Sequence, residues 1–177
     1  VEVRIVDGKD REVPRGTVGE VAVRGPNVMV GYWNKPELTT AALRGGWMHT
    51  GDAGYLDGEG YLFVRDRIKD MIVSGAENIY PAEIEAALYE HAAIAEAAVI
   101  GVPDARWGET VMAVIVARSG EAPTEGDLEA HCRARLGGYK VPRRYAFVDE
   151  LPRNTSGKVL KRELREQYWS GHARRVG

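Results

Sequence analysis

The sequence contains a single cysteine, Cys132, among its 177 residues. One cysteine excludes an internal disulfide framework and fits a reducing, cytoplasmic location. We expect Cys132 to be a small buried apolar residue on a helix rather than a reactive group. The four histidines are scattered, and no cysteine–histidine spacing fits a zinc site, so no metal site is expected. The pattern Gly-x-Ser-x-Gly is missing too, which argues against a serine hydrolase.

Long hydrophobic runs and an excess of one charge are also absent. No apolar segment reaches the length needed to cross a membrane, and the opening Val-Glu-Val-Arg is not a signal peptide. The formal net charge of −2 gives no electrostatic reason to expect nucleic acid or an anionic membrane as the main partner. The first residues enter a strand pattern directly, without an initiator methionine, as expected of a part of a longer polypeptide.

The first part of the chain is patterned as β-structure. Apolar and charged residues alternate over 1–6 and again over 19–24, which is typical of a half-buried pair of strands. Residues 55–56 and 61–64 flank a glycine-containing turn and predict a second hairpin. A short helix is expected over 38–43. We therefore expect an all-β unit here, with little helix.

Beyond residue 80 the pattern changes to helices alternating with continuous apolar segments. Pro81 opens the first expected helix, and Thr124 begins another with a capping-box pattern. Continuous apolar segments are typical of strands covered by helices. Expected helices cover 81–91, 124–136 and 159–168, and expected strands cover 95–102, 110–117 and 145–148. After Ser170 the basic tail is expected to lack fixed structure. The predicted fold class is α/β (α+β): a small domain with a three-stranded sheet flanked by helices plus a hairpin, preceded by the all-β unit.

A dense run of charges, Asp66-Arg67-Ile68-Lys69-Asp70, separates the two patterns. Charges this dense rarely lie inside a strand, so the run is interpreted as a solvated connector. A connector between folded units is a candidate hinge, because a few residues there can absorb a large φ/ψ change. An ordinary charged loop is the alternative when these residues are taken alone. The expected domains are 1–66 and 67–177, the second large enough for its own core.

Four motifs stand in order along the chain and together resemble one family. They are WMHTGD at 47–52, DRIKDMIVSGAENIYP at 66–81, GYKVP at 138–142 and NTSGK at 154–158. They are similar to motifs of the adenylate-forming superfamily of acyl-CoA synthetases, peptide adenylation domains and luciferases. The second motif is most like that of bacterial fatty-acyl-CoA ligases. The resemblance spans essentially the whole chain and implies the C-terminal part of an enzyme whose phosphate loop and acyl pocket lie in a missing N-terminal domain.

The resemblance implies which residues hold the nucleotide and which one acts on it. Asp52, Val64 and Arg67 correspond to nucleotide-binding positions, and a carboxylate such as that of Asp52 can accept hydrogen bonds from two vicinal ribose hydroxyls. A turn aspartate and a surface arginine are the alternatives for Asp52 and Arg67. Lys158 corresponds to the catalytic lysine. Its ammonium would stabilise charge that develops as pyrophosphate leaves, extending freely from a mobile backbone.

The resemblance also implies a hinge and a binding site for the acyl acceptor. Lys69 occupies the hinge position about which the C-terminal domain turns between two half-reactions. Ser74, Gly75 and Ala76 would then face the acyl channel, where glycine permits close approach of pantetheine. Ala76 departs from the second glycine that is common in the family. Lys140 is a further candidate for CoA phosphates, together with Arg143 and Arg144 and, more weakly, Arg106 and Trp107.

These observations predict an ATP-dependent, AMP-forming acyl-CoA ligase acting on a carboxylic acid, with a fatty acid expected by resemblance. ATP, CoA and Mg²⁺ are the expected cofactors, and Mg²⁺ would be held mainly by parts not in this chain. The chain alone is expected to be inactive. Two alternatives stay open: an adenylation domain that loads a carrier protein, and a non-catalytic module that binds only CoA or a partner.

Overall fold

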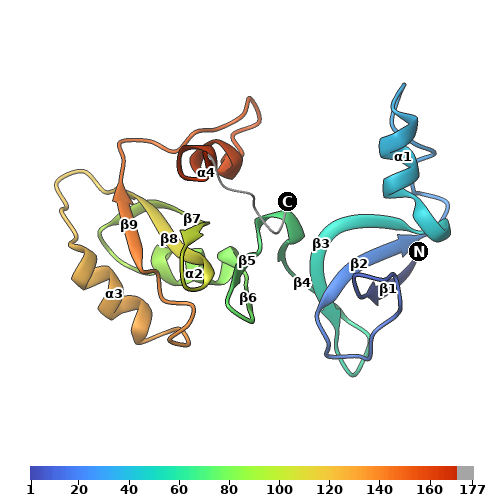
Figure 1. The fold of residues 1–177 in the computed structure, drawn as a ribbon, viewed down its shortest axis with the longest axis horizontal. Helices are drawn as coiled ribbons and strands as arrows, with labels where there is room; N and C mark the ends of the chain where they lie inside the picture. Colours follow the sequence, from blue (N-terminus) through green and yellow to red (C-terminus); the bar gives the residue numbers. More distant parts are fainter. Residues whose placement is uncertain (171–177) are drawn as a thin grey trace. The chain divides into compact units, whose positions relative to one another are not determined.

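The computed structural model describes residues 1–170, and the expected irregular tail at 171–177 lies outside the described residues. The chain divides into two compact units, Val1–Lys69 and a second unit that begins at Asp70 (Figure 1). The boundary expected after residue 66 lies slightly earlier in the chain than this division. Within the described chain, no helix is long and apolar enough to cross a membrane.

The first unit is built on an antiparallel sheet with the order β1-β2-β3-β4. Its strands are β1 (Glu2–Val6), β2 (Gly19–Arg24), β3 (Met48–Leu56) and β4 (Leu62–Arg67). A short helix, α1 (Pro36–Ala42), and a 3₁₀ turn, η1 (Arg44–Gly46), lie between β2 and β3. Ile5, Val21, Ala22 and Ala53 are buried in this unit. The predicted pairing of residues 1–6 with 19–24 is therefore confirmed.

The charged run does not begin as a connector, because Asp66 and Arg67 belong to strand β4. The expectation that dense charge excludes a strand is wrong here. Arg67 pairs in register with Asp52 of β3, so opposite charges face each other across the two strands. After the strand, the chain turns through the 3₁₀ segment η2 (Ile68–Asp70).

The second unit contains a five-stranded sheet in which β6-β5-β8-β7 follow one another and β9 pairs in parallel with β8. Its strands are β5 (Ile72–Ser74), β6 (Glu77–Ile79), β7 (Ile94–Asp104), β8 (Gly108–Ala117) and β9 (Arg144–Phe147). Its helices are α2 (Pro81–Tyr89), α3 (Glu125–Arg133) and α4 (Lys161–Trp169). The hairpin β5–β6 joins the sheet because Ser74 pairs with Gly108.

Both faces of this sheet are covered, which is why β7 and β8 are continuously apolar. Alternate residues such as Val99 and Ile115 pack in one cluster with residues of α2 and α3. The intervening residues, including Ile100, pack with Leu164 of α4 in a second cluster. Cys132 on α3 is fully buried, as expected. Burial raises the pKa of its thiol, which keeps it in the unreactive form. The predicted fold class is confirmed.

The ends of three helices of the second unit differ from the prediction, and α2 ends at Tyr89 rather than 91. Thr124 caps α3 with the expected capping box, its side chain accepting from the Asp127 amide while Asp127 accepts from the Thr124 amide. The helix ends at Arg133 rather than 136, and Leu136 packs against the core from beyond it. Helix α4 begins at Lys161 because Val159 forms an isolated β-bridge with Arg153.

Candidate functional site

Asp52 and Arg67 form an ion pair on the β3–β4 hairpin. Nε of Arg67 lies 3.0 Å from Oδ1 of Asp52, and Nη1 of Arg67 donates to the Thr50 carbonyl at 3.1 Å. Both side chains remain accessible, with exposed fractions of 33% for Asp52 and 44% for Arg67. The second carboxylate oxygen of Asp52 can therefore still accept hydrogen bonds from a ligand.

A β-bulge brings Val64 to the same face of this hairpin. Gly54 pairs with Val64 and Ala53 with Asp66, so Arg65 is an extra residue on β4. In a regular strand, Val64 and Arg67 would point to opposite faces. The extra residue restores both to the face of Asp52, as bulges near functional sites commonly re-aim side chains. Asp52, Val64 and Arg67 thus share one face, with Val64 exposed.

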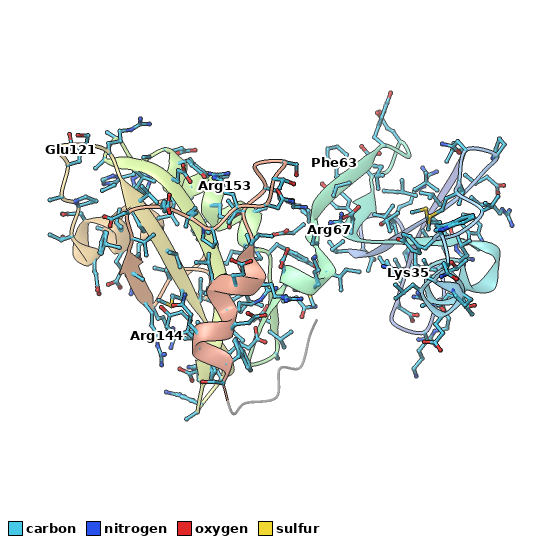
Figure 2. The ribbon with its side chains drawn as sticks, turned by 90° about the horizontal axis from the view of Figure 1, so that it is seen from above. Lys35, Phe63, Arg67, Glu121, Arg144 and Arg153 are labelled. Atoms are coloured by element: carbon cyan, nitrogen blue, oxygen red, sulfur yellow. The ribbon has the colours of Figure 1, made fainter. Side chains whose placement is uncertain are left out.

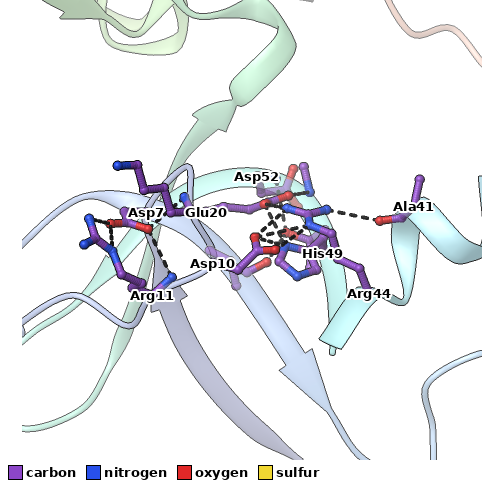
Figure 3. A network of polar contacts seen from close by, with 12 residues as sticks. Asp7, Asp10, Arg11, Glu20, Ala41, Arg44, His49 and Asp52 are labelled. Carbon is purple, nitrogen blue, oxygen red and sulfur yellow. Dashed lines mark hydrogen bonds and ion pairs between the residues drawn. The ribbon is translucent and has the colours of Figure 1, made fainter. Parts of the chain in front are cut away.

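A polar network fixes the segment of β3 that presents Asp52 (Figure 3). Oε1 of Glu20 accepts from the Gly51 amide at 3.1 Å, and Oε2 of Glu20 is 2.8 Å from Nδ1 of His49. The Thr50 hydroxyl donates to the Val21 carbonyl at 2.8 Å and accepts from the Asp52 amide at 3.1 Å. These contacts hold the backbone of Asp52 in place before any ligand binds.

His49 lies in a cluster that sequence reasoning missed. Its ring and the carboxylates of Asp10 and Glu20 place possible metal-ligand atoms within 4.8 Å of one another. Arg44 donates to Asp10 at 2.9 Å and to Glu20 at 3.0 Å, so a guanidinium already compensates both carboxylates. Accordingly, the pKa of Asp10 lies below its ordinary value, chiefly because of Arg44. The cluster therefore fits a structural network better than a cation site, and no spacing in the sequence signals it.

The Gly75-Ala76 turn connects β5 to β6 and is packed against Trp107. Gly75 has φ +64°, whereas Ala76 does not have positive φ, which is the pattern of a type II′ hairpin turn. The Gly75 amide donates to the Trp107 carbonyl at 2.8 Å, and a Cβ at Gly75 would lie 3.1 Å from the Trp107 ring. Glycine is thus required at 75, while alanine at 76 violates no backbone requirement.

Trp107 lies between two exposed arginines. The guanidinium carbons of Arg106 and Arg143 are 4.6 and 5.6 Å from the ring centroid. Oδ1 of Asp104 accepts from the amides of Trp107 and Arg106, both at 2.9 Å, and these bonds lower the pKa of Asp104. The turn, the aromatic ring and the two cations form a candidate anion-binding surface, which we call the Trp107 surface.

Lys140, by contrast, is already paired. Its ammonium donates to both carboxylate oxygens of Glu83, at 2.6 and 2.8 Å, and its side chain is 19% exposed. Burial alone would lower the pKa of Lys140, but the Glu83 carboxylate outweighs it and the pKa is raised. The structure therefore makes Lys140 a weaker candidate for binding an anion than Arg106 or Arg143.

Lys158 ends a turn organised by the side chain of Asn154. Oδ1 of Asn154 accepts from the Ser156 amide at 3.1 Å, the Lys158 amide at 2.9 Å and the Ser156 hydroxyl at 2.8 Å. Gly157 takes φ +82°. These bonds organise the backbone of the turn, and the expected mobility of this loop stays a prediction. The Lys158 side chain is exposed, and no ion pair with a carboxylate involves it within residues 1–170.

Arg153 ties this turn to the sheet (Figure 2). One of its nitrogens donates to the Gly157 carbonyl at 2.6 Å, and another pairs with Glu96 of β7. Neither Arg153 nor Glu96 was a candidate from the sequence. The two residues are 57 positions apart, so no local pattern signals the contact. Lys69, the expected hinge, lies in η2 at the end of the first unit.

Residues 83–158 match the family described as the AMP-binding enzyme C-terminal domain. The chain is 51% identical over 176 residues to a fatty acid–[acyl-carrier-protein] ligase, ScoC, of Streptomyces coeruleorubidus, covering 99% of this chain and 34% of that protein. It is 53% identical over 154 residues to a long-chain-fatty-acid–CoA ligase of Bacillus subtilis strain 168, covering 87% of this chain and 28% of that one.

A solved structure has the same fold. It is the o-succinylbenzoate CoA synthetase MenE of Bacillus subtilis in complex with its acyl-adenylate intermediate, with a TM-score of 0.88 and 41% identity, covering 99% of this chain and 34% of the other. The chain thus spans about a third of the length of the proteins it matches. The resemblance drawn from the four motifs is confirmed: residues 83–158 are an AMP-binding enzyme C-terminal domain, and the chain is similar over 99% and 87% of its length to parts of two acyl ligases.

Proposed function

We propose that the polypeptide containing this chain is an AMP-forming acyl-CoA ligase. A carboxylate attacks the α-phosphate of ATP, forming an acyl-phosphate bond and releasing pyrophosphate. The thiol of CoA then attacks the acyl carbon, forming a thioester and releasing AMP. The observation that carries the proposal is the Lys158 turn, whose backbone is hydrogen-bonded to Asn154 and whose ammonium has no carboxylate partner among residues 1–170.

Lys158 acts in the first half-reaction. Negative charge builds on the phosphate oxygens as pyrophosphate leaves, and a preorganised cation stabilises that charge more than it stabilises the bound substrates. Asn154 fixes the backbone of Lys158 by two amide hydrogen bonds, so less motion must be frozen when the ammonium engages the phosphate.

Asp52, Val64 and Arg67 bind the nucleotide from one face of the β3–β4 hairpin. The Asp52 carboxylate accepts hydrogen bonds from the ribose hydroxyls, and Arg67 orients that carboxylate through their ion pair. Mg²⁺ accompanies the phosphates of ATP. The Asp10, Glu20 and His49 cluster does not fit this role, because Arg44 compensates its carboxylates. The ligands of Mg²⁺ are therefore assigned mainly to the phosphates and to the rest of the polypeptide.

The acceptor thiol enters past Ser74, Gly75 and Ala76 in the second half-reaction. Gly75 lets the pantetheine chain approach the backbone closely, and the Trp107 surface offers two guanidinium groups and an aromatic face to the nucleotide end of CoA. Lys140 contributes less, because Glu83 holds its ammonium. Residues 67–177 serve as a mobile lid that turns about Lys69 between the half-reactions, and residues 1–66 are part of the larger adenylation domain.

The acid is a fatty acid in this proposal. The names of two relatives support it, because one is a fatty acid–[acyl-carrier-protein] ligase and the other a long-chain-fatty-acid–CoA ligase. The same names keep a carrier protein open as the alternative acceptor. The Trp107 surface favours CoA, since its cations and ring suit a free nucleotide phosphate.

The test uses the full-length protein and separates the half-reactions. Lys158→Ala should reduce release of pyrophosphate from ATP and fatty acid by on the order of 10²-fold or more, while transfer from supplied acyl-adenylate to CoA is retained. Lys9→Ala is a matched control, since Lys9 also lies in an exposed Asx-organised turn. Near wild-type pyrophosphate release by Lys158→Ala, or equal loss of both half-reactions, would contradict the assignment.

Two further arms separate the alternatives. Lys69→Pro fixes φ at the hinge and should spare pyrophosphate release but block transfer to CoA. Supplying CoA and a carrier protein in parallel decides the acceptor. The 177-residue chain alone should show no carboxylate-dependent exchange of pyrophosphate into ATP. A full-length protein that binds CoA but releases no pyrophosphate with any carboxylic acid would support the non-catalytic alternative.

A further inference from the structure

A nearly buried ion pair joins the start of the second unit to its last helix. Nη1 of Arg165 lies 2.7 Å from Oδ1 of Asp70, although the two residues are 95 positions apart in the chain. The exposed fractions of their side chains are only 11% and 13%. Asp70 is the first residue of the second unit and directly follows Lys69, the proposed hinge.

The partner helix is firmly seated on the sheet. Leu164 of α4 is 7% exposed and packs with Ala98 and Ile100 of β7. At the C-terminal end of α4, the Trp169 indole donates to the Gly101 carbonyl at 2.9 Å. Arg165 lies between these two contacts on a helix that is packed against the sheet, and it can hold Asp70 in a defined position.

The first unit has a corresponding anchor on its side of the hinge. Arg67 is tied to Asp52 at 3.0 Å and to the Thr50 carbonyl at 3.1 Å, each within the first unit. Two ion pairs thus enclose Ile68 and Lys69, one belonging to each unit. A change in φ or ψ at these two residues would leave both anchors intact.

The ion pair between Arg165 and Asp70 is better suited to holding a segment in position than to stabilising the fold. Taking two charges out of water costs about as much as their attraction returns, so a nearly buried pair adds little net stability over apolar residues of the same volume. Removing one partner, however, leaves an unpaired charge that is costly to keep out of water. The segment that carries this charge therefore moves until the charge is solvated. An ion pair at Asp70 therefore makes the position of the backbone depend on Arg165.

We propose that Arg165 is a positioning residue for the hinge, which holds Asp70 to α4 and confines rotation between the units to Ile68 and Lys69. Any effect of Arg165 on the two half-reactions rests on the proposed ligase function. The limit on rotation between the units does not depend on that function. Without the pair, rotation spreads into Asp70 and Met71, and the units sample a wider range of orientations.

The same helix supplies a matched control. Nζ of Lys161 lies 2.7 Å from Oε1 of Glu85, with exposed fractions of 15% and 17%, and Glu85 also accepts from the Val99 amide at 2.7 Å. This pair joins α4 to α2 rather than to the hinge. Lys161→Met therefore removes a comparably buried cation from α4 without touching Asp70.

The test uses the whole chain with spin labels on the exposed residues Lys9 and Glu121, one in each unit, and Cys132 left buried. Arg165→Met should widen the distribution of label distances and raise amide exchange at Asp70 and Met71 by on the order of tenfold. Lys161→Met should change neither the distribution of label distances nor the exchange rates. Arg165→Lys should give a distribution close to that of the wild-type chain. Asp70→Asn, which keeps the side-chain volume, should reproduce Arg165→Met in a folded protein.

Equal widening by Arg165→Met and Lys161→Met would overturn the proposal, because loosening of α4 would then explain both. An unchanged distance distribution and unchanged exchange in Arg165→Met and Asp70→Asn would overturn it as well. Half-reaction assays of the full-length protein are read separately. If the wild-type protein forms no acyl-adenylate, the proposed function fails, while the distance measurements still decide the role of Arg165.

Discussion

Three turns in the described part of the chain share one hydrogen-bonding pattern, and one of them carries Lys158. In each, Oδ1 of the first residue accepts from the amides two and four positions ahead, at 2.8 to 3.1 Å. The acceptor and its donors are Asp7 with Lys9 and Arg11, Asp57 with Glu59 and Tyr61, and Asn154 with Ser156 and Lys158. The fourth residue of each turn has positive φ, with values of 59° at Asp10, 95° at Gly60 and 82° at Gly157.

The three turns differ in the charge of the acceptor. Asp7 and Asp57 are carboxylates, and Asp7 also pairs with the Arg11 side chain that ends its turn. The turn that ends in Lys158 has an amide instead. An amide oxygen supplies the same geometry without a charge that would attract the ammonium. The comparison teaches that the turn itself needs only an oxygen at its first position, and that asparagine leaves the charge of Lys158 available.

The largest effect should follow from removing that oxygen. In the full-length ligase, Asn154→Ala should lower the rate of pyrophosphate release by on the order of 10 to 10²-fold, because the backbone of Lys158 is no longer held. Transfer from supplied acyl-adenylate to CoA should be affected less. Asp57→Ala removes the equivalent bonds from a turn without a proposed role and should leave pyrophosphate release near its wild-type rate. Equal loss in both variants would mean that stability, not positioning, is measured.

Much of this architecture could be predicted from the sequence. The alternation in residues 1–6, the capping pattern at Thr124 and the continuous apolar segments gave the right elements, because each is a local consequence of burial on one face or both. Lys158 was a candidate through the resemblance of the NTSGK motif, and the positive φ of Gly157 was not predicted. The organising role of Asn154 was not recognised, although Asx turns have a local signature.

The rest depended on contacts between distant segments. The dense charges at Asp66 and Arg67 looked incompatible with a strand, yet pairing of Arg67 with Asp52 compensates one of them. The bulge that brings Val64 to the face of Asp52 has no signal in composition. Lys140 looked available for phosphate, but Glu83 holds its ammonium. Such partners come from other elements of the fold, and a single sequence does not reveal them.

A smaller effect is expected when the acceptor is kept but given a charge. Asn154→Asp should preserve the turn, as Asp7 and Asp57 show that a carboxylate can organise it. The added carboxylate should attract the Lys158 ammonium and lower pyrophosphate release by roughly threefold to tenfold. Pyrophosphate release from ATP and fatty acid measures this loss, with transfer from supplied acyl-adenylate to CoA as the reference. An unchanged rate of pyrophosphate release would show that the neutrality of Asn154 has no electrostatic purpose.

Gly157, the residue at positive φ in the Lys158 turn, allows a third comparison. The quantity compared is the free energy of unfolding of two variants. Gly157→Ala should cost about 1 kcal/mol, because a Cβ there meets no atom within 4 Å and only the left-handed backbone is strained. Gly157→Asn should cost less, since Asp10 already occupies the equivalent position in the first turn. Chemical denaturation of the two variants measures the difference. A loss with asparagine as large as with alanine would point to a clash rather than backbone strain.

The smallest effect is the pH dependence of the stability of the turn that begins at Asp7. The Arg11 side chain, followed by the amides of Arg11 and Lys9, lowers the pKa of Asp7 from 3.8 to about 2. Because the folded pKa is depressed, the contribution of Asp7 to stability is present above pH 3.8 and is lost as the pH falls through about 2. The Asn154 turn does not titrate and should stay unchanged over this window. Carboxyl NMR shifts should give a midpoint for Asp7 near 2, and Arg11→Met should move it upward. A midpoint at 3.8 in the wild-type chain would show that the turn does not depend on the charge of Asp7.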